Sequence, residues 1–397
     1  DILFIISVAA IAYTYFIYPL ILFCMSAGIQ LVADNRYVLA KLQRRTQASG
    51  DLPKVAVVLA AFNEETVIEA RLQNLLEQDY PQDKLHIYLG SDGSDDQTNE
   101  LVKTFMQQSN VNNITFHDFT ERRGKVSVLN ELVEETNEEI LVFSDANTNF
   151  EPDAISKLVR HFHAPNIGAV CGELELFDAV AGTNRDSLYW RYERLLKFHE
   201  SRIGGLLGAN GAIYAIKQEL YQPLSTDTLI DDFAIVMQIS DQKKDVIYDP
   251  EAIAKEEVAP AIEDEFRRRI RIGAGNYQAL TRFSHFMSPS YGIRSFTFIS
   301  HKALRWLVPH CMLIALTSNF LLLGEAPIYN WIFAGQMVFY AIAAYTHVNQ
   351  NNSIPLSNII YFFVSMNTAL GRGFIKFISG NVKGTWQRTA RIDTRNS

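Results

Sequence analysis

Acidic side chains stand at three places in the sequence where they could act together. Asp92 and Asp145 each close an apolar, strand-like run, and the pair Asp231-Asp232 follows farther along the chain. In open α/β sheets ligands bind at the carboxyl ends of strands, and carboxylate oxygens are ligands that Mg²⁺ or Mn²⁺ prefers. The pattern therefore predicts an enzyme with a metal and nucleotide site at one sheet edge.

Each of these patterns has an ordinary explanation when it is taken alone. Asp92-Gly93-Ser94 is a common turn, and Glu64-Glu65 complements the dipole at a helix start. For Asp231-Asp232 without its context, a pair that caps a helix N-terminus is the better interpretation. The functional hypothesis therefore depends on several patterns occurring together.

The elements that must position these residues alternate between strand-like and helix-like segments. Such alternation is typical of a mostly parallel sheet covered by helices. Looser strand-like runs follow at 167–176 and 212–216, with an amphipathic stretch at 186–202 between them. We interpret that stretch as a helix packing an aromatic face on the core, ahead of a role in acceptor or membrane binding. The expected central elements are strands at 55–60, 85–90, 113–117 and 140–143 and helices at 64–77, 98–108 and 125–136.

The composition suits one large domain with additional apolar segments. The chain has 397 residues, a net charge of -8 and 48% hydrophobic residues, so no nucleic-acid partner is expected. Its three cysteines give no disulfide framework or zinc spacing, and no histidine is assigned a role. Four nearly uncharged stretches are long enough, or nearly so, to cross a bilayer: 2–32, 307–323, 331–347 and 354–370.

The first apolar stretch is interpreted as a membrane anchor. A signal peptide is the alternative, but the stretch lacks a basic start and an obvious cleavage site. Basic residues such as Arg36 and Lys302 flank the spans on the side of the central domain, which should therefore face the cytoplasm. The basic tail should also stay inside, so 354–378 is expected to be re-entrant or interfacial unless the tail breaks that rule. We expect a multi-pass protein of the inner (cytoplasmic) membrane.

The expected organisation has six parts. They are an anchor at 1–33, a basic linker at 34–52, a cytoplasmic domain at 53–284, an interfacial segment at 285–301, C-terminal membrane segments at 302–380 and a basic cytoplasmic tail at 381–397.

Four short motifs occur in a fixed order: Ala61-Phe62-Asn63-Glu64-Glu65, Ser91-Asp92-Gly93-Ser94, Arg123-Gly124-Lys125 and Ser144-Asp145-Ala146-Asn147. In this order and spacing they resemble the donor half of family-2 glycosyltransferases, in particular the membrane-embedded bacterial polysaccharide synthases. The resemblance covers 53–278 by motif. It implies a GT-A-type α/β domain that binds a nucleotide sugar, with N- and C-terminal transmembrane helices.

The resemblance implies donor-binding roles for these motifs. The residue matching Asp92 would read the uracil of a UDP-sugar, and those matching Glu64 and Lys125 would help to hold the nucleotide. A carboxylate can accept the N–H of a base, and an ammonium suits phosphate. The other donor-binding residues of the motifs are Ala61, Asn63, Ser144 and Asp145.

The resemblance also implies a divalent metal, Mg²⁺ or Mn²⁺. Asp145 matches the first acid of the family's Asp-x-Asp motif, and Asn147 stands in place of the second. An amide oxygen can ligate the metal but adds no charge. Either another group completes the metal's shell or the metal binds more weakly.

Downstream, Asp232 matches the family's general base, with Asp231 in place of a Glu. Two adjacent carboxylates in a closed pocket raise each other's pKa, which suits a base near neutrality. Arg271 matches an arginine that would stabilise the departing diphosphate, and Arg268 lies at the family's Gln position. Ile272 replaces a Trp that stacks on the acceptor sugar in processive cellulose, chitin and hyaluronan synthases, which weakens the expectation of a long chain extended without release.

Two further segments resemble family elements less specifically. The loop 208–212, with Gly208, Asn210 and Gly211, resembles an acceptor loop, and an ordinary tight turn explains it equally well. The segment 386–391 resembles a tail element that covers the active site, and a disordered basic tail held by anionic lipid is an equal alternative.

The function implied is an inverting glycosyltransferase that moves a sugar from a UDP-sugar to a growing polysaccharide or lipid-linked glycan at the membrane surface. Its expected partners are membrane lipid and export or regulatory proteins. Transfer of a single sugar to polyprenyl phosphate is the alternative within the class, favoured by the few spans and the missing Trp. A non-catalytic nucleotide-binding component of an export complex is the alternative from another class, disfavoured because Asp92, Asp145, Asp232 and Arg271 are all present.

Overall fold

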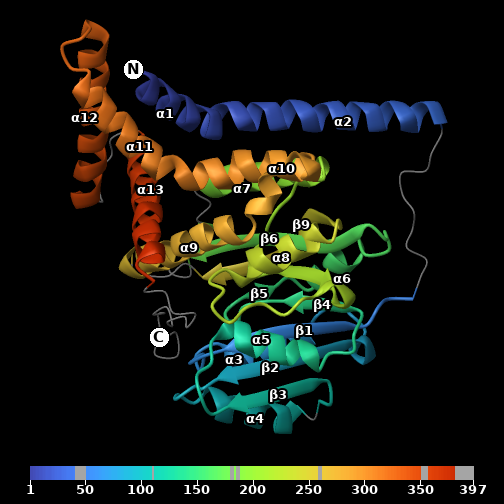
Figure 1. The fold of residues 1–397 in the computed structure, drawn as a ribbon. Coiled ribbons are helices and arrows are strands. Elements are labelled where there is room, and N and C mark those ends of the chain that lie inside the picture. Colours follow the sequence, from blue (N-terminus) through green and yellow to red (C-terminus); the bar gives the residue numbers. More distant parts are fainter. Residues whose placement is uncertain are drawn as a thin grey trace. The chain divides into compact units, whose positions relative to one another are not determined.

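The computed structural model describes residues 1–40, 51–109, 111–178, 183–184, 188–257, 262–349 and 356–380, and Figure 1 shows its ribbon. The chain divides into two compact units. The first consists of Asp1–Ile21 and Glu263–Val382, and the second of Leu22–Ile262 and Lys383–Ser397. The expected tail, with its segment 386–391, and most of the basic linker lie outside the described residues.

The second unit contains a mixed, mostly parallel sheet, with strand order β3-β2-β1-β4-β8-β6-β9-β5 and with β7 pairing beside β6. Strands β3, β2, β1 and β4 run parallel to one another. Strand β8 runs antiparallel to β4 and β6, β9 runs parallel to β6, and β5 runs antiparallel to β9. The predicted mostly parallel α/β sheet is confirmed. Its strands are β1 (Val55–Ala61), β2 (Leu85–Asp92), β3 (Ile114–Phe119), β4 (Ile140–Phe143), β5 (Asn149–Phe150), β6 (Ile167–Asp178), β7 (Thr183–Asn184), β8 (Tyr214–Lys217) and β9 (Asp245–Glu257).

Apolar runs become strands here because helices cover both faces of the sheet. Every residue of β1 is buried, as expected for a parallel strand at the centre. Leu59 packs in one core with Leu72 of α3 (Ile68–Leu76), Val102 of α4 (Thr98–Ser109) and Ile155 of α6 (Ala154–Val159). The helix α5 (Lys125–Glu134) packs on β1 and β2, and a Cβ at Gly90 would lie 2.4 Å from Val128 of α5. Glycine at this position therefore lets α5 approach the sheet.

Some element boundaries differ from the expected ones. The helix expected to start at Glu64 begins at Ile68, because the amides of Val67 and Ile68 both donate to the Glu64 carbonyl and close a turn before the helix. The strand β9 and the helices α6 and α8 (Asp231–Asp241) were not expected from the apolar pattern. The expected amphipathic helix is present as α7 (Leu188–Arg202), which packs on β9.

An N-terminal helix is held on α7 within the second unit. The helix α2 (Tyr18–Ala40) places Ser26 2.9 Å from Nδ1 of the buried His199, and Arg202 donates to Gln30 at 2.8 Å. These polar contacts fix the part of α2 from Leu22 onward against the sheet-containing unit.

The first unit consists of helices and short helical turns. In it α1 (Ile2–Ala12) packs on α11 (Leu304–Leu321), and α12 (Pro327–Val348) packs on α13 (Ser357–Ile378). Between α9 (Ile262–Arg282) and α11 lie α10 (Ile293–Thr297) and short helical turns. A Cβ at Gly373 of α13 would lie 2.7 Å from the Ala274 amide of α9, so these two helices cross at glycine.

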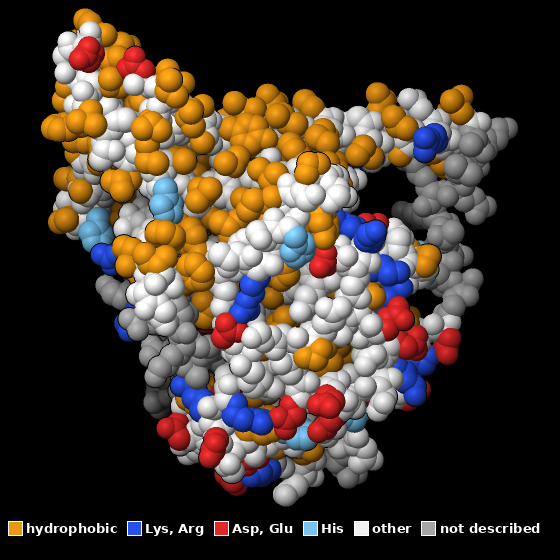
Figure 2. Space-filling model, in the orientation of Figure 1, with side chains coloured by type: hydrophobic (Ala, Val, Ile, Leu, Met, Phe, Trp, Pro, Cys, Tyr) orange, Lys and Arg blue, Asp and Glu red, His pale blue; other side chains and the backbone are white. Residues whose placement is uncertain are grey.

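Among the described residues, the helix running from Ile2 to Leu39 is the one long and apolar enough to cross a membrane. Figure 2 shows hydrophobic side chains on the surface of the helices of the first unit, and exposed ones include Ile6, Leu313, Phe320 and Trp331. Within 354–378, the segment expected to be re-entrant or interfacial, Ser357–Ile378 forms one continuous helix. Its place in a membrane and the multi-pass layout stay predictions.

Candidate active site

Lys125 joins two carboxylates at the carboxyl edge of the parallel strands. It begins α5, while Asp145 follows β4 and Asp231 begins α8. Its Nζ atom lies 2.9 Å from Oδ1 of Asp145 and 3.0 Å from Oδ2 of Asp231. Burial lowers the pKa of Lys125, but the two carboxylates outweigh burial and hold the pKa above its ordinary value. The structure thus brings three of the predicted site residues into direct contact around a charged ammonium.

Asp232 is a partly buried acid beside this group. Burial first, and then the charge of Asp231, raise the pKa of Asp232 from 3.8 to about 6, although Lys125 and a 2.8 Å hydrogen bond from the Phe233 amide oppose the shift. Burial thus contributes more than the neighbouring acid on which the sequence argument relied. At neutral pH the carboxylate is mostly ionised and can still take a proton, which is the property of a general base.

The loop 208–212 lies against this acid. A Cβ at Gly211 would lie 3.3 Å from Oδ2 of Asp232, so the backbone comes close to the carboxylate. Gly208 has φ +106°, a conformation that L side chains rarely adopt. Asn210 fixes the loop, because its amide donates to Sγ of Cys171 at 3.3 Å and its side chain donates to the Gly172 carbonyl at 3.0 Å. The predicted acceptor loop is therefore a tight, well-anchored turn next to the candidate base.

The loops after β1 and β2 fasten each other. The Asn63 side chain donates to the Asp95 carboxylate and accepts from the Asp95 amide at 3.0 Å. Asn63 has φ 55°, in the left-handed region that Asn tolerates better than most residues. Two more amides, those of Glu64 and Glu65, donate to side chains of the other loop, Thr98 at 2.8 Å and Asp96 at 3.2 Å. We call this set of bonds the loop latch.

Asp92 and Ala61 lie at the ends of adjacent strands, where Ala61 pairs with Ser91 in parallel register. Asp92 is fully buried, and its carboxylate accepts from the amides of Arg123 at 2.6 Å and Gly124 at 3.0 Å. These bonds hold the loop that leads into α5 and hence Lys125. The contacts of Asp92 are thus to backbone, and its expected role in reading uracil stays a prediction.

A buried arginine lies behind Asp145, and the motifs did not indicate it. Arg71 of α3 donates to Oγ of Ser144 at 2.7 Å and to Asn74 at 2.7 Å, and Ser144 donates in turn to the Ala212 carbonyl at 3.0 Å. Burial lowers the pKa of Arg71 to about 9, and the charge of Asp145 opposes this shift. Arg71 therefore remains a cation at neutral pH. Ser144 connects α3, the end of β4 and the segment just before β8. A lone arginine on a helix gives no sequence signal for such a role.

Asn147 contacts an acid that sequence reasoning also missed. Its Nδ2 atom donates to Oε1 of Glu256 on β9 at 2.8 Å. Among the described residues, no three His, Cys, Asp or Glu side chains gather to hold a metal by themselves. Magnesium in nucleotide sites is held by one or two carboxylates together with substrate phosphates. Asp145 and Asn147 therefore fit a metal whose remaining ligands come from a bound diphosphate. The two side chains do not by themselves form a complete metal site.

Arg268, Arg271 and Ile272 lie on α9, in the first unit, where all three are partly buried. The next residue, Gly273, faces α13, since a Cβ there would lie 3.2 Å from the Leu370 Cα. Packing between α9 and α13 thus accounts for the glycine that follows the arginines. The catalytic and acceptor-binding roles expected for Arg268, Arg271 and Ile272 stay predictions.

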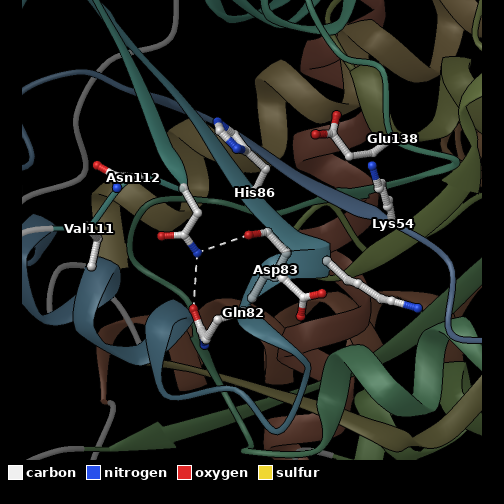
Figure 3. A pocket seen from close by; sticks show the side chains of 10 residues that line it. Lys54, Gln82, Asp83, His86, Val111, Asn112 and Glu138 are labelled. Carbon is white, nitrogen blue, oxygen red and sulfur yellow. Dashed lines mark hydrogen bonds between the residues drawn. The ribbon is translucent and has the colours of Figure 1, made fainter.

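A hollow of about 630 Å³ lies at the opposite, amino edge of the parallel strands (Figure 3). Most of the side chains around it are polar, and Asn113 donates to Gln82 at 3.1 Å and to the Leu85 carbonyl at 3.0 Å. None of the predicted site residues lines this hollow; its lining includes Lys54, Asp83, Lys84, His86 and Glu138.

Two family models match the chain. The model described as "Glycosyl transferase family group 2" matches residues 140–346, more than half of the chain, and "Glycosyl transferase family 2" matches residues 56–217. The poly-beta-1,6-N-acetyl-D-glucosamine synthase of Staphylococcus epidermidis is 25% identical over 254 residues, 62% of this chain and 59% of that protein. The synthase of the same name from Staphylococcus aureus strain COL is 25% identical over 58% of this chain and 57% of that protein. The chain thus spans under three fifths of the length of these relatives.

A solved structure is similar over nearly the whole chain. A mannosyltransferase from Pyrobaculum calidifontis, in complex with GDP-Man and Mn²⁺, is 22% identical, covers 95% of this chain and 99% of its own, and has a TM-score of 0.70. At this identity the likeness concerns the fold alone, a GT-A-like α/β arrangement.

Proposed function

The chain belongs to the family 2 glycosyltransferases, and we propose that it moves a sugar from a UDP-sugar to a growing polysaccharide or lipid-linked glycan, with inversion at the anomeric carbon. The observation that carries the proposal is the group formed by Lys125, Asp145, Asp231 and Asp232. It joins a cation suited to a diphosphate with an acid suited to act as a base. The likeness to poly-beta-1,6-N-acetyl-D-glucosamine synthases supports a polysaccharide product.

In this proposal Asp232 takes the proton of an acceptor hydroxyl. The hydroxyl oxygen attacks the anomeric carbon from the face opposite the diphosphate, and the bond from that carbon to the phosphate oxygen breaks. An α-linked donor then gives a β-linkage. The pKa of about 6 supports this role, because the carboxylate is mostly ionised at neutral pH and still basic enough to accept a proton. The close approach of the Gly211 backbone to the same carboxylate supports an acceptor loop here, because residue 211 places no side chain between the loop and the base.

The departing UDP would be stabilised by cations. Lys125 supplies one, held in place by Asp145 and Asp231. Asp145 and Asn147 would hold a Mg²⁺ or Mn²⁺, which neutralises charge on the diphosphate when it is bound. Arg271, with Arg268 beside it, would add the planar donors that suit phosphate, as the family resemblance implies. The donor-binding residues are completed by Ala61, Asn63, Glu64, Asp92 and Ser144.

The acceptor would lie at the cytoplasmic face of the inner membrane. The long apolar helix from Ile2 to Leu39 supports an anchor, and exposed apolar side chains on α11 and α12 support further membrane contact. The contacts of Ser26 and Gln30 with α7 would keep the catalytic unit next to the anchor. Membrane lipid and export or regulatory proteins are the proposed partners, and the proposed layout is multi-pass with the boundaries given above.

Transfer of one sugar to polyprenyl phosphate is a second candidate. The sequence feature that favours it is Ile272, at the position of the acceptor-stacking Trp of processive synthases. Product length separates the two, because single transfer gives one lipid-linked sugar and polymer synthesis gives a ladder. A nucleotide-binding component without catalysis would bind UDP and release none from any donor.

The testing experiment uses the full chain in detergent with Mn²⁺ or Mg²⁺, a membrane lipid extract and a panel of UDP-sugars, with GDP-Man as a comparison donor. We expect UDP release with one donor, and loss of that release in Asp232→Asn. Release from GDP-Man alone would contradict the proposed donor. UDP binding without release from any donor would overturn the proposed transferase.

A further inference from the structure

The acid absent from the metal motif has a counterpart on another strand. Asn147 occupies the position of the second acid in the motif 145–147, and Glu256 lies 109 residues away in sequence. In the structure Oε1 of Glu256 accepts a hydrogen bond from Nδ2 of Asn147 at 2.8 Å. The fold thus places a carboxylate one hydrogen bond away from the position where the motif lacks one.

This contact fixes which atom of Asn147 can ligate a metal. An ionised carboxylate only accepts hydrogen bonds, so the amide group nearest to Glu256 is the NH₂. The amide oxygen Oδ1 then points away from Glu256. Oxygen is the amide atom that Mg²⁺ or Mn²⁺ binds, so Glu256 selects the orientation of Asn147 that metal binding requires.

The position of Glu256 is set by backbone pairing on both sides. On one side Glu256 pairs with Leu176 of β6, and on the other the neighbouring Lys255 pairs with Asn149 of β5. The strand β5 is fixed in turn by Asn74 of α3, whose side chain accepts from the Phe150 amide and donates to the Phe150 carbonyl, both at 2.8 Å. Strand pairing therefore fixes the backbone from which the Glu256 side chain reaches Asn147.

Glu256 also faces away from the nearest lysine in sequence. Successive side chains of a strand point to opposite faces of a sheet. The ammonium of Lys255 is bound to Glu151 at 2.5 Å on the other face of β9. The charge of Lys255 is therefore directed away from Asn147, and the carboxylate of Glu256 supplies negative charge on the Asn147 side.

We propose that Glu256 replaces the missing second acid: it orients the amide oxygen of Asn147 toward the metal and contributes its negative charge from one hydrogen bond farther out. The inference rests on the proposed function, because the metal belongs to that function. Glu256 is a positioning residue here and touches neither the metal nor the sugar. Removing a partner of this kind lowers metal affinity by about 10- to 100-fold in known metal sites.

The test measures Mn²⁺ binding directly, by electron paramagnetic resonance of free Mn²⁺ in the presence of UDP. We compare wild type, Glu256→Gln, the double variant Asn147→Asp with Glu256→Gln, and Glu175→Gln as a matched control on the adjacent strand. We expect Glu256→Gln to weaken Mn²⁺ binding about tenfold or more. We expect the double variant, which moves the acid back into the motif, to bind within about threefold of wild type. Glu175→Gln should bind as wild type does.

The outcomes distinguish failure of this inference from failure of the proposed function. Wild-type Mn²⁺ affinity in Glu256→Gln would overturn the inference, and so would a double variant as weak as Glu256→Gln. Either result could occur while wild type still binds Mn²⁺ with UDP and releases UDP from a donor. If wild type neither binds Mn²⁺ with UDP nor releases UDP, the proposed function itself fails. Thermal unfolding of each variant verifies that the fold is intact.

Discussion

The two ends of the parallel strands carry similar residues and behave differently. At the amino edge Lys84 contacts Asp51, whose side chain is 94% exposed, and the hydrogen bond from Lys84 lowers the pKa of Asp51. At the carboxyl edge Lys125 contacts two carboxylates, and burial raises the pKa of the adjacent Asp232 to about 6. The same residue types thus give an ordinary surface ion pair at one edge and a candidate base at the other. Burial makes the difference.

Strand direction explains why burial occurs at one edge. The helices α5 and α8 begin at the carboxyl edge, and their first residues are Lys125 and Asp231. Helix N-termini and strand ends converge there, which is why ligands of open α/β sheets bind on that side. The amino edge holds the hollow of Figure 3, and neither Lys125 nor Asp231 lines it.

The largest expected difference between the two edges is in the rate of sugar transfer after removal of one acid at each edge. Asp232→Asn should lower the rate of sugar transfer by about 10²- to 10⁴-fold, because positioned proton transfer contributes that much. Asp83→Asn, at the exposed amino edge, should leave the rate within about twofold of wild type. UDP release under saturating donor measures both. Equal losses in the two variants would break the comparison.

A smaller effect is expected from removing one lysine at each edge. Lys125→Met leaves Asp145 and Asp231 without their shared cation, and we expect the free energy of unfolding to fall by about 2–4 kcal/mol. We expect a smaller loss of stability than for a fully buried ion pair, because the Asp145 side chain is 37% exposed and solvent screens its charge. Lys84→Met, whose partner Asp51 is exposed, should leave the denaturation midpoint unchanged. Denaturant unfolding in detergent measures both, and equal midpoints would show that the carboxyl-edge contact is no stronger.

The pH dependence of stability sharpens the same contrast. The folded-state pKa of Asp232 is raised from 3.8 to about 6, so its contribution to stability is present below about pH 4 and is lost as the pH rises through 6. Asp232→Asn removes this loss. We expect the variant to be more stable than wild type at pH 7 by on the order of 1–3 kcal/mol, and equal to it at pH 4. Denaturant unfolding at the two pH values measures the difference, and a variant less stable than wild type at pH 7 would contradict the raised pKa.

The smallest expected effects on stability and transfer rate come from changing one tyrosine at each edge to phenylalanine. Tyr80 donates to the Pro53 carbonyl at 2.6 Å near the amino edge, and Tyr221 donates to Asn130 of α5 at 2.7 Å near the carboxyl edge. Each change to Phe should lower the free energy of unfolding by about 1 kcal/mol. Tyr221→Phe alone should also slow transfer by a few-fold, because Asn130 lies on the helix that begins with Lys125. Equal transfer rates in the two variants would remove the distinction between the edges.

Much of the sheet could be predicted because its signal is local. The runs 55–60, 85–90 and 140–143 are apolar and continuous, and each became a parallel strand. The residues of the site that follow these strands were identified for the same reason. The short strand β5 and the strand β9, in which charged residues interrupt the apolar ones, carry no such pattern, so the second half of the sheet could not be derived in detail.

Two site neighbours could not be predicted, because they depend on distant pairing. Arg71 is 73 residues from Ser144, and Glu256 is 109 residues from Asn147. Each is an ordinary charged residue in its local sequence, and its role appears only when a helix or strand places it at the site. The pKa of Asp232 was expected from the neighbouring acid, whereas burial, which no local pattern reveals, is the larger cause.

The loop latch has a consequence for how this edge of the molecule opens. Its bonds join residues 63–65 to residues 95–98, so neither loop can leave its place without breaking bonds of the other. Two loops that share their hydrogen bonds unfold as one cooperative unit. Their amide hydrogens should therefore give a single common free energy of opening in deuterium exchange, and ordering either loop around a nucleotide would slow exchange in both.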